Sequence, residues 1–195
     1  MYSERVQSRS VQGRETGQKV MDVAERLFRE QGFVTTTVRQ IAEAGGVSVG
    51  TVVAVGDKST LLVRIYERWI RDFHRQDVQD VAESSADRPV DTVIDYLQPI
   101  IDYFVEDADL SREYLAILVR GQVESDVFDA LAQALITDIE TILRCAKKPN
   151  ASAAARAMYF AYLGVLVAAS HGAIPLSAVS TEVHRAVAAV VGEGK

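Results

Sequence analysis

The chain has 195 residues, of which 48% are apolar and 25% are charged, so it carries enough apolar side chains for a folded core and is excluded from the class of disordered chains. Its net charge of −6 excludes a protein with a uniformly basic surface. A single cysteine excludes an internal disulfide, and residues 1–20 lack the apolar run of a secretory signal. We therefore expect a cytoplasmic protein.

The charge is unevenly distributed along the chain. Residues 1–60 carry a net charge of +1, and the remainder carries −7. Any polyanionic partner is therefore expected to meet the amino-terminal part.

Residues 1–15 are polar, show no apolar repeat and are predicted to form a flexible arm. A helix is predicted next, because apolar side chains recur at helical spacing: Val20, Val23, Ala24, Leu27 and Phe28. Gly32 is expected to end it, since glycine readily takes the left-handed conformation beyond a helix end.

Two short helices are predicted to follow. Hydroxyls at Thr35–Thr37 are suited to cap the first, and Gly45–Gly46 are expected to end it. Ser48 is suited to cap the second. Two short helices joined by a tight glycine turn indicate a helix-turn-helix, and the alternative is a helical hairpin that only fills space.

The rest of the chain also shows helical spacing. Asp57–Ser59 are suited to cap a long helix whose apolar face runs from Leu61 to Phe73. Further helices are expected from Pro89 onward, and no strand alternation is visible. The predicted fold class is all-α, with a helix-turn-helix domain over residues 16–60 and a larger helical domain over 61–195.

The segment 153–170 differs from the others because small and apolar residues lie all round the predicted helix. The alternatives for this segment are a membrane span and a helix buried between two subunits. Ala, Gly, Ser and Tyr residues dilute its apolarity and Pro175 follows it, so we favour burial between subunits and expect no membrane partner.

Three motifs between residues 27 and 52 closely resemble the tetracycline-repressor (TetR) family of bacterial regulators. They are Leu27–Phe33, Thr36–Ala42 and Gly46–Val52, followed by Asp57–Lys58 and Leu61–Leu62. The resemblance covers roughly residues 16–66, and such an ordered run is more specific than a lone helix-turn-helix pattern.

The resemblance implies a ligand-responsive transcriptional regulator, by family habit a repressor, that binds a palindromic double-stranded DNA operator as a homodimer. It also implies that helices near residues 126–147 and 152–172 pair with their copies in a second subunit. The DNA-contacting positions that it implies are Thr37, Arg39, Ser48, Val49, Gly50, Thr51 and Lys58. For Arg39 the alternative is an ordinary solvated helix charge, and Ser48 has a capping role in either case.

One departure from the family pattern stands out. After Gly50 and Thr51 the family usually has aromatic residues before the loop lysine, whereas this chain has Val52–Gly56 and is one residue shorter. A tyrosine hydroxyl that commonly binds phosphate is replaced by Val53. The alternative function is therefore a degenerate family member that binds a small molecule or a partner protein without specific DNA binding.

Six aromatic residues of the second domain are candidates for a pocket that takes a small-molecule effector, because aromatic walls with polar tips suit such sites. They are Trp69, Phe73, Tyr96, Tyr103, Tyr114 and Tyr162, and the alternative for each is a plain core position. We expect no enzyme, metal or cofactor, because no histidine lies at metal-site spacing and no catalytic motif is present.

Overall fold

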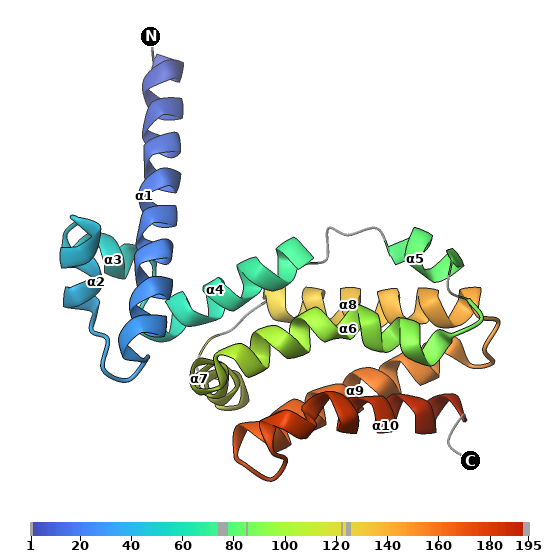
Figure 1. Cartoon of the computed structure of the whole chain (residues 1–195). Coiled ribbons are helices and arrows are strands. Elements are labelled where there is room, and N and C mark those ends of the chain that lie inside the picture. The colour runs from blue at the N-terminus through green and yellow to red at the C-terminus, as the bar shows by residue number, and fades with distance from the viewer. Residues whose placement is uncertain (1, 74–77, 85, 122, 124–125, 193–195) are drawn as a thin grey trace. The chain divides into compact units, whose positions relative to one another are not determined.

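In this computed structural model, described for residues 2–73, 78–84, 86–121, 123 and 126–192, helices follow one another with short connections (Figure 1). The α-helices are α1 (Tyr2–Gln31), α2 (Val38–Gly45), α3 (Val49–Val55), α4 (Lys58–Phe73), α5 (Val78–Ser84), α6 (Pro89–Glu106), α7 (Ala108–Val119), α8 (Asp126–Cys145), α9 (Ala151–Ser170) and α10 (Val179–Val191). No strand occurs among the described residues, so the all-α prediction is confirmed.

The helices belong to two compact units. The amino-terminal unit comprises the chain up to Arg68 together with Ala116–Val123, and the carboxy-terminal unit comprises Trp69–Leu115 and the chain from Glu124 onward. The expected boundary after residue 60 falls inside α4 and stays a prediction.

The first helix begins earlier than predicted. The sequence predicts a helix only after residues 1–15, whereas α1 begins at Tyr2 and continues to Gln31, and the flexibility of the arm stays a prediction. Glutamate, arginine and glutamine are frequent in this stretch, and their straight side chains lose little rotamer freedom in a helix. The absence of an apolar stripe therefore does not prevent a helix there.

The apolar stripe of α1 forms the core of the amino-terminal unit. Val20, Ala24 and Phe28 are buried, and α1 packs against α2 and α3. The helix ends at Gly32, whose φ of +86° lies in the left-handed region, as predicted.

Two ion pairs connect α4 to α1. The Arg68 guanidinium lies 2.7 Å from an Asp22 carboxylate oxygen and 2.5 Å from a Glu25 carboxylate oxygen. Leu61, Leu62 and Ile65 are buried on the same helix. Apolar burial supplies most of the packing energy, and the forked guanidinium fixes the angle of approach.

In the carboxy-terminal unit α8 packs against α9, α9 against α10, and α10 against α6. The core of this unit is formed by fully buried apolar side chains, among them Val93, Leu97, Ile139, Leu143, Met158 and Val183. The helix α6 continues through Pro99 from Pro89 to Glu106.

Among the described residues α9 is the one helix that is long and apolar enough to cross a membrane by length and composition alone. Only 33% of its apolar window is buried inside the chain. Ala153, Ala157, Phe160 and Gly164 are exposed, and their spacing places them on one helical face. Within a single chain, α9 is therefore not buried on all sides as expected, because one of its faces is exposed.

A side-chain cap starts α4. Asp57 Oδ1 accepts a hydrogen bond from the Thr60 amide at 2.7 Å, which confirms the predicted cap. The hydrogen bonds from the Thr60 amide and hydroxyl lower the pKa of Asp57 below its ordinary value of 3.8. The cap therefore stabilises the folded chain most when the carboxyl group is ionised.

We expect Asp57→Ala to lower the free energy of unfolding by about 1 kcal/mol at pH 7, because the cap is lost. Since the folded-state pKa is depressed, this contribution is complete above the ordinary pKa of 3.8 and is lost as the pH falls through the folded value. Urea unfolding at several pH values measures the difference between the two proteins. Asp57→Asn, which keeps an accepting oxygen, is the control, and an equal loss in both variants would contradict a cap by the side-chain oxygen.

Candidate DNA-binding interface

A glycine turn sets the position of α3. Gly46 takes a left-handed conformation with φ of +60°, and its amide donates to carbonyl oxygens at the end of α2. The Val47 amide donates to the Ala42 carbonyl at 3.0 Å. The predicted end of the second helix at Gly45–Gly46 is therefore confirmed, and the chain turns sharply into α3.

Ser48 caps α3. Its Oγ accepts a hydrogen bond from the Thr51 amide at 3.0 Å and lies 2.9 Å from Thr51 Oγ1. The predicted cap is confirmed, and the two hydroxyl groups are hydrogen-bonded to each other.

The short helix α3 buries a single residue, Val52, which is fully inaccessible to solvent. Its opposite face is open, since Val49 is 47% and Val53 57% exposed. Gly50 and Ala54 are exposed beside them. Three of the predicted DNA-contacting positions, Ser48, Val49 and Gly50, thus lie together on an accessible surface, and Thr51 is half-buried next to them.

The junction between α3 and α4 is tightly packed at Gly56. A Cβ placed on Gly56 would lie 2.8 Å from Thr60 Cγ2 and 2.9 Å from Thr60 Cβ, closer than side-chain atoms tolerate. The Arg64 guanidinium donates a hydrogen bond to the Val55 carbonyl just before this glycine. The junction between α3 and α4 is therefore compact and has no space for a side chain at position 56.

A reciprocal cap starts α2. The Thr37 hydroxyl accepts from the Gln40 amide at 3.2 Å, and Gln40 Oε1 accepts from the Thr37 amide at 2.8 Å. Arg39 in the first turn is exposed. The structure thus gives Thr37 a capping role and leaves the Arg39 guanidinium on the surface.

The structure gives Lys58 a role that the sequence did not indicate. Its ammonium group donates to the carbonyl oxygens of Phe33 and Val34 at 2.8 Å and 3.2 Å, and it lies 4.4 Å from the centre of the Phe33 ring. Lys58 therefore ties the connection between α1 and α2 to the start of α4.

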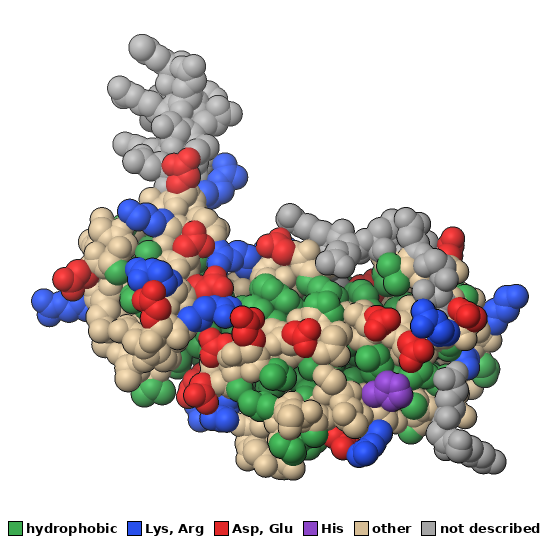
Figure 2. All heavy atoms as spheres, in the orientation of Figure 1, with side chains coloured by type: hydrophobic (Ala, Val, Ile, Leu, Met, Phe, Trp, Pro, Cys, Tyr) green, Lys and Arg blue, Asp and Glu red, His purple; other side chains and the backbone are tan. Residues whose placement is uncertain are grey.

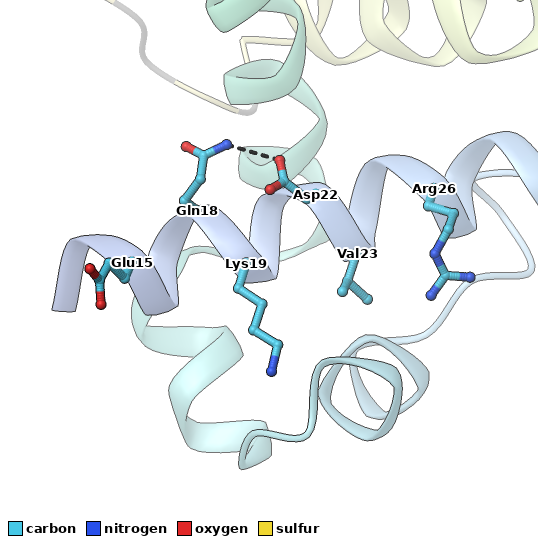
Figure 3. Close-up of a pocket in the computed structure, with 6 residues that line it drawn as sticks. All are labelled: Glu15, Gln18, Lys19, Asp22, Val23 and Arg26. Atoms are coloured by element: carbon cyan, nitrogen blue, oxygen red, sulfur yellow. Dashed lines mark hydrogen bonds between the residues drawn. The ribbon is translucent and has the colours of Figure 1, made fainter. Parts of the chain in front are cut away.

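Sequence reasoning missed Lys19. Lys19, Val23 and Arg26 share one face of α1, and Figure 3 shows their side chains along an open hollow of about 530 Å³. A Cβ on Gly46 would lie 4.0 Å from Lys19 Nζ, so this ammonium reaches the turn before α3. The four-residue spacing of Lys19 and Val23 was the available signal, because it places the lysine beside the apolar stripe.

On the face that Figure 2 shows, side chains of both charges lie on the amino-terminal unit. Several acidic groups in this unit are paired, including Asp22 and Glu25 with Arg68 and Glu30 with Arg26. The exposed lysine and arginine near α3 are therefore local features rather than part of a continuous basic surface.

Four of the six aromatic candidates form a cluster in the carboxy-terminal unit. The Trp69 and Tyr103 rings stack with centres 4.0 Å apart, Trp69 stacks with Phe73 at 6.0 Å, and Phe73 meets Tyr96 at 5.2 Å. Tyr114 on α7 and Tyr162 on α9 are buried.

The polar ends of two candidate tyrosines are held in the protonated form. Burial, and then the hydrogen bond that its hydroxyl donates to Asp138, raises the pKa of Tyr96. Burial, and then the neighbouring Tyr159, raises the pKa of Tyr162. Both phenols therefore remain neutral at physiological pH. In the described part of the chain no group of three or more His, Cys, Asp or Glu side chains is placed to hold a metal ion.

Known proteins are similar to this chain in part of the amino-terminal sequence and in the fold. Residues 20–54 match the family model of bacterial regulatory proteins, tetR family. The chain is 42% identical over 57 residues to the HTH-type transcriptional regulator AcrR of Shigella flexneri, an alignment that covers 29% of this chain. The chain spans 26% of the length of that curated relative.

Solved structures are similar over most of the chain. The FadR repressor of Thermus thermophilus, in complex with lauroyl-CoA, gives a TM-score of 0.69 at 18% identity and covers 92% of this chain and 95% of that one. SmeT, the repressor of the Stenotrophomonas maltophilia multidrug efflux pump SmeDEF, gives 0.64 at 22% identity, with 91% and 89% covered. A SmeT–triclosan complex gives 0.62 at 24% identity, with 90% of each chain covered.

Because these structures are less than 25% identical to this chain, they establish a shared fold and no more. The sequence match to the family model falls on the helices that carry the capped turn and the exposed face of α3. Over this amino-terminal segment, the chain is therefore similar to bacterial regulatory proteins of the tetR family.

Proposed function

We propose that the chain is a cytoplasmic, ligand-responsive transcriptional regulator that binds a palindromic DNA operator as a homodimer and represses transcription. The observation that carries this proposal is the exposed α3, held by its Ser48 cap on a tetR-family domain. In a helix-turn-helix protein such a helix enters the major groove, and a twofold dimer places its two copies about 34 Å apart.

Phosphate contacts in this proposal come from side chains around α3. Arg39 is exposed at the start of α2, and Lys19 reaches the turn between α2 and α3. Each cation that meets a phosphate releases condensed counterions, so affinity falls as salt rises. Thr37, Ser48 and Thr51 support this surface mainly through their caps, and Val49 and Gly50 face the bases.

The proposed dimer forms through α8 and α9. The exposed stripe of Ala153, Ala157, Phe160 and Gly164 is apolar, and small residues allow two helices to approach closely. Pairing with a second copy removes this stripe from water. The apolar composition of α9 then serves a subunit interface rather than a membrane.

The proposed effector is a small, largely apolar molecule that binds near the aromatic cluster of the carboxy-terminal unit. Trp69, Phe73, Tyr96 and Tyr103 supply apolar walls, and the Tyr96 hydroxyl and Asp138 supply a polar end. Two of the similar structures contain lauroyl-CoA and triclosan, both of which have large apolar parts. Tyr114 and Tyr162 are further candidates from the sequence.

A second candidate function is that of a family member that has lost specific DNA binding. The observation that favours it is the composition of α3, which has no charged side chain and has Val53 where a tyrosine hydroxyl is usual. Selection of duplexes from a random DNA library by the full chain separates the two functions. Enrichment of a palindrome supports the regulator, and an unenriched pool supports the degenerate member.

For the selected duplex, we expect Lys19→Ala and Arg39→Ala each to lower the slope of log affinity against log salt by about one, because each removes one phosphate contact. Fluorescence anisotropy over a salt series measures the slope. Arg185→Ala, which removes an exposed arginine from α10, is the matched control and leaves the slope unchanged. Slopes equal to that of the unmodified chain in both variants would exclude these two contacts.

A variant at Lys58 tests whether its ammonium group stabilises the fold through the Phe33 and Val34 carbonyl oxygens or serves only as a phosphate contact. We expect Lys58→Met to lower the free energy of unfolding without DNA by about 1 to 2 kcal/mol, because two charged hydrogen bonds are lost. Arg39→Met, on the exposed surface, changes it by less than about 0.5 kcal/mol. Chemical denaturation measures both, and an unchanged stability in Lys58→Met would show that the two carbonyl contacts contribute nothing.

The dimer is tested at Gly164. A Cβ at this position meets no atom within 4 Å, so Gly164→Gln is accommodated within one chain and gains helix propensity. We expect this variant to dissociate into folded monomers in sedimentation velocity, because the longer side chain separates the α9 helices. Gly13→Gln on α1, which is equally open, is the control. A dimer that survives in Gly164→Gln would place the interface elsewhere.

A further inference from the structure

The exposed face of α3 has an unusual chemistry for a surface that reads DNA. Val49 and Val53 lie one helical turn apart on this face, with Gly50 and Ala54 beside them. Within α3, all of which the structure describes, every exposed residue therefore presents methyl groups or no side chain at all. None of their side chains offers a hydrogen-bond donor or acceptor to a base edge.

The neighbouring hydroxyl groups contribute to the helix itself. Ser48 and Thr51 are hydrogen-bonded to each other at 2.9 Å, and Ser48 also accepts the Thr51 amide. Moving the Ser48 hydroxyl to a base would break the cap that starts the helix, at a cost of about 1 kcal/mol. Thr51 is half-buried beside the exposed face, so that face itself offers only apolar side chains for direct reading.

Thymine is the base that offers an apolar group in the major groove, namely its 5-methyl. The other base edges there present carbonyl, ring nitrogen or amino groups, and these lose water without compensation when a valine covers them. On the basis of the proposed function, we infer that α3 recognises its operator through thymine methyl groups, which pack against Val49 and Val53. Arg39 and Lys19 hold the backbone and contribute affinity but little sequence preference.

Gly50 is consistent with such close packing. A Cβ added at Gly50 would lie 3.6 Å from Ser48 Oγ, an ordinary contact, so the fold itself has space for a side chain there. The bare backbone at this position lets the helix approach the floor of the groove, where the methyl groups lie.

The experiment uses the full chain and the palindrome that it selects from a random duplex library. Thymines of each half-site are replaced one at a time by deoxyuridine, which keeps the pairing edge and removes only the 5-methyl group. At the positions beneath α3 we expect the dissociation constant to rise about fourfold for each methyl removed, the effect of exposing one buried carbon. At thymines outside the half-sites it does not change.

A protein variant identifies which side chain meets the methyl group. Val53→Thr keeps the shape of the side chain and replaces one methyl group by a hydroxyl, and Val119→Thr, at an exposed valine of α7, is the matched control. We expect Val53→Thr to weaken binding to the thymine duplex and to lose sensitivity to deoxyuridine at one position per half-site. A duplex with 5-methylcytosine in place of that thymine recovers part of the affinity relative to cytosine.

The outcomes distinguish this inference from the proposed function. A selected duplex that binds equally well with thymine and with deoxyuridine throughout its half-sites overturns the methyl recognition and leaves the regulator in place. Enrichment of G·C pairs beneath α3 has the same consequence. An unenriched pool overturns the proposed function and this inference together.

Discussion

The hydrogen bond from the Thr51 amide to Ser48 Oγ, together with the burial of Val52, is the constraint on which the rest of the amino-terminal unit depends. An isolated helix of this length is not stable in water, because the first turn restricts the backbone of several residues and forms only one hydrogen bond in return. Helix propensity alone does not stabilise α3. Its additional stability comes from the cap, the left-handed turn at Gly46 and the Arg64 contact with the Val55 carbonyl. Since only one side chain points inward, the opposite face remains available to a partner.

Features set by neighbours in the sequence were predictable. Gly32, Gly46, Ser48 and Asp57 end or begin helices by interactions within about four residues, so their roles follow from residue type and position. The apolar stripe of α1 and the all-α class follow from helical spacing in the same way. Helix boundaries at these positions agree with the structure because no distant contact has to be known.

Features set by distant contacts were not predictable. Lys58 donates to carbonyl groups at Phe33 and Val34, and Lys19 lies beside Gly46, both across gaps in the sequence that local patterns do not bridge. The helical start of α1 was missed for a different reason. A polar segment without an apolar stripe reads as a loop, although its straight side chains are good helix formers. The clustering of four aromatic candidates likewise depends on how α4 and α6 pack.

The close approach of Gly56 to Thr60 constrains how the sequence of this chain is able to change over time. A residue larger than glycine at position 56 collides with the β-carbon of Thr60, and that carbon is present in every residue except glycine. Position 56 therefore accepts a side chain only if the junction lengthens or shifts. The exposed Val53 position is not restricted in this way, so sequence change at this end of α3 is confined to the residues before the glycine.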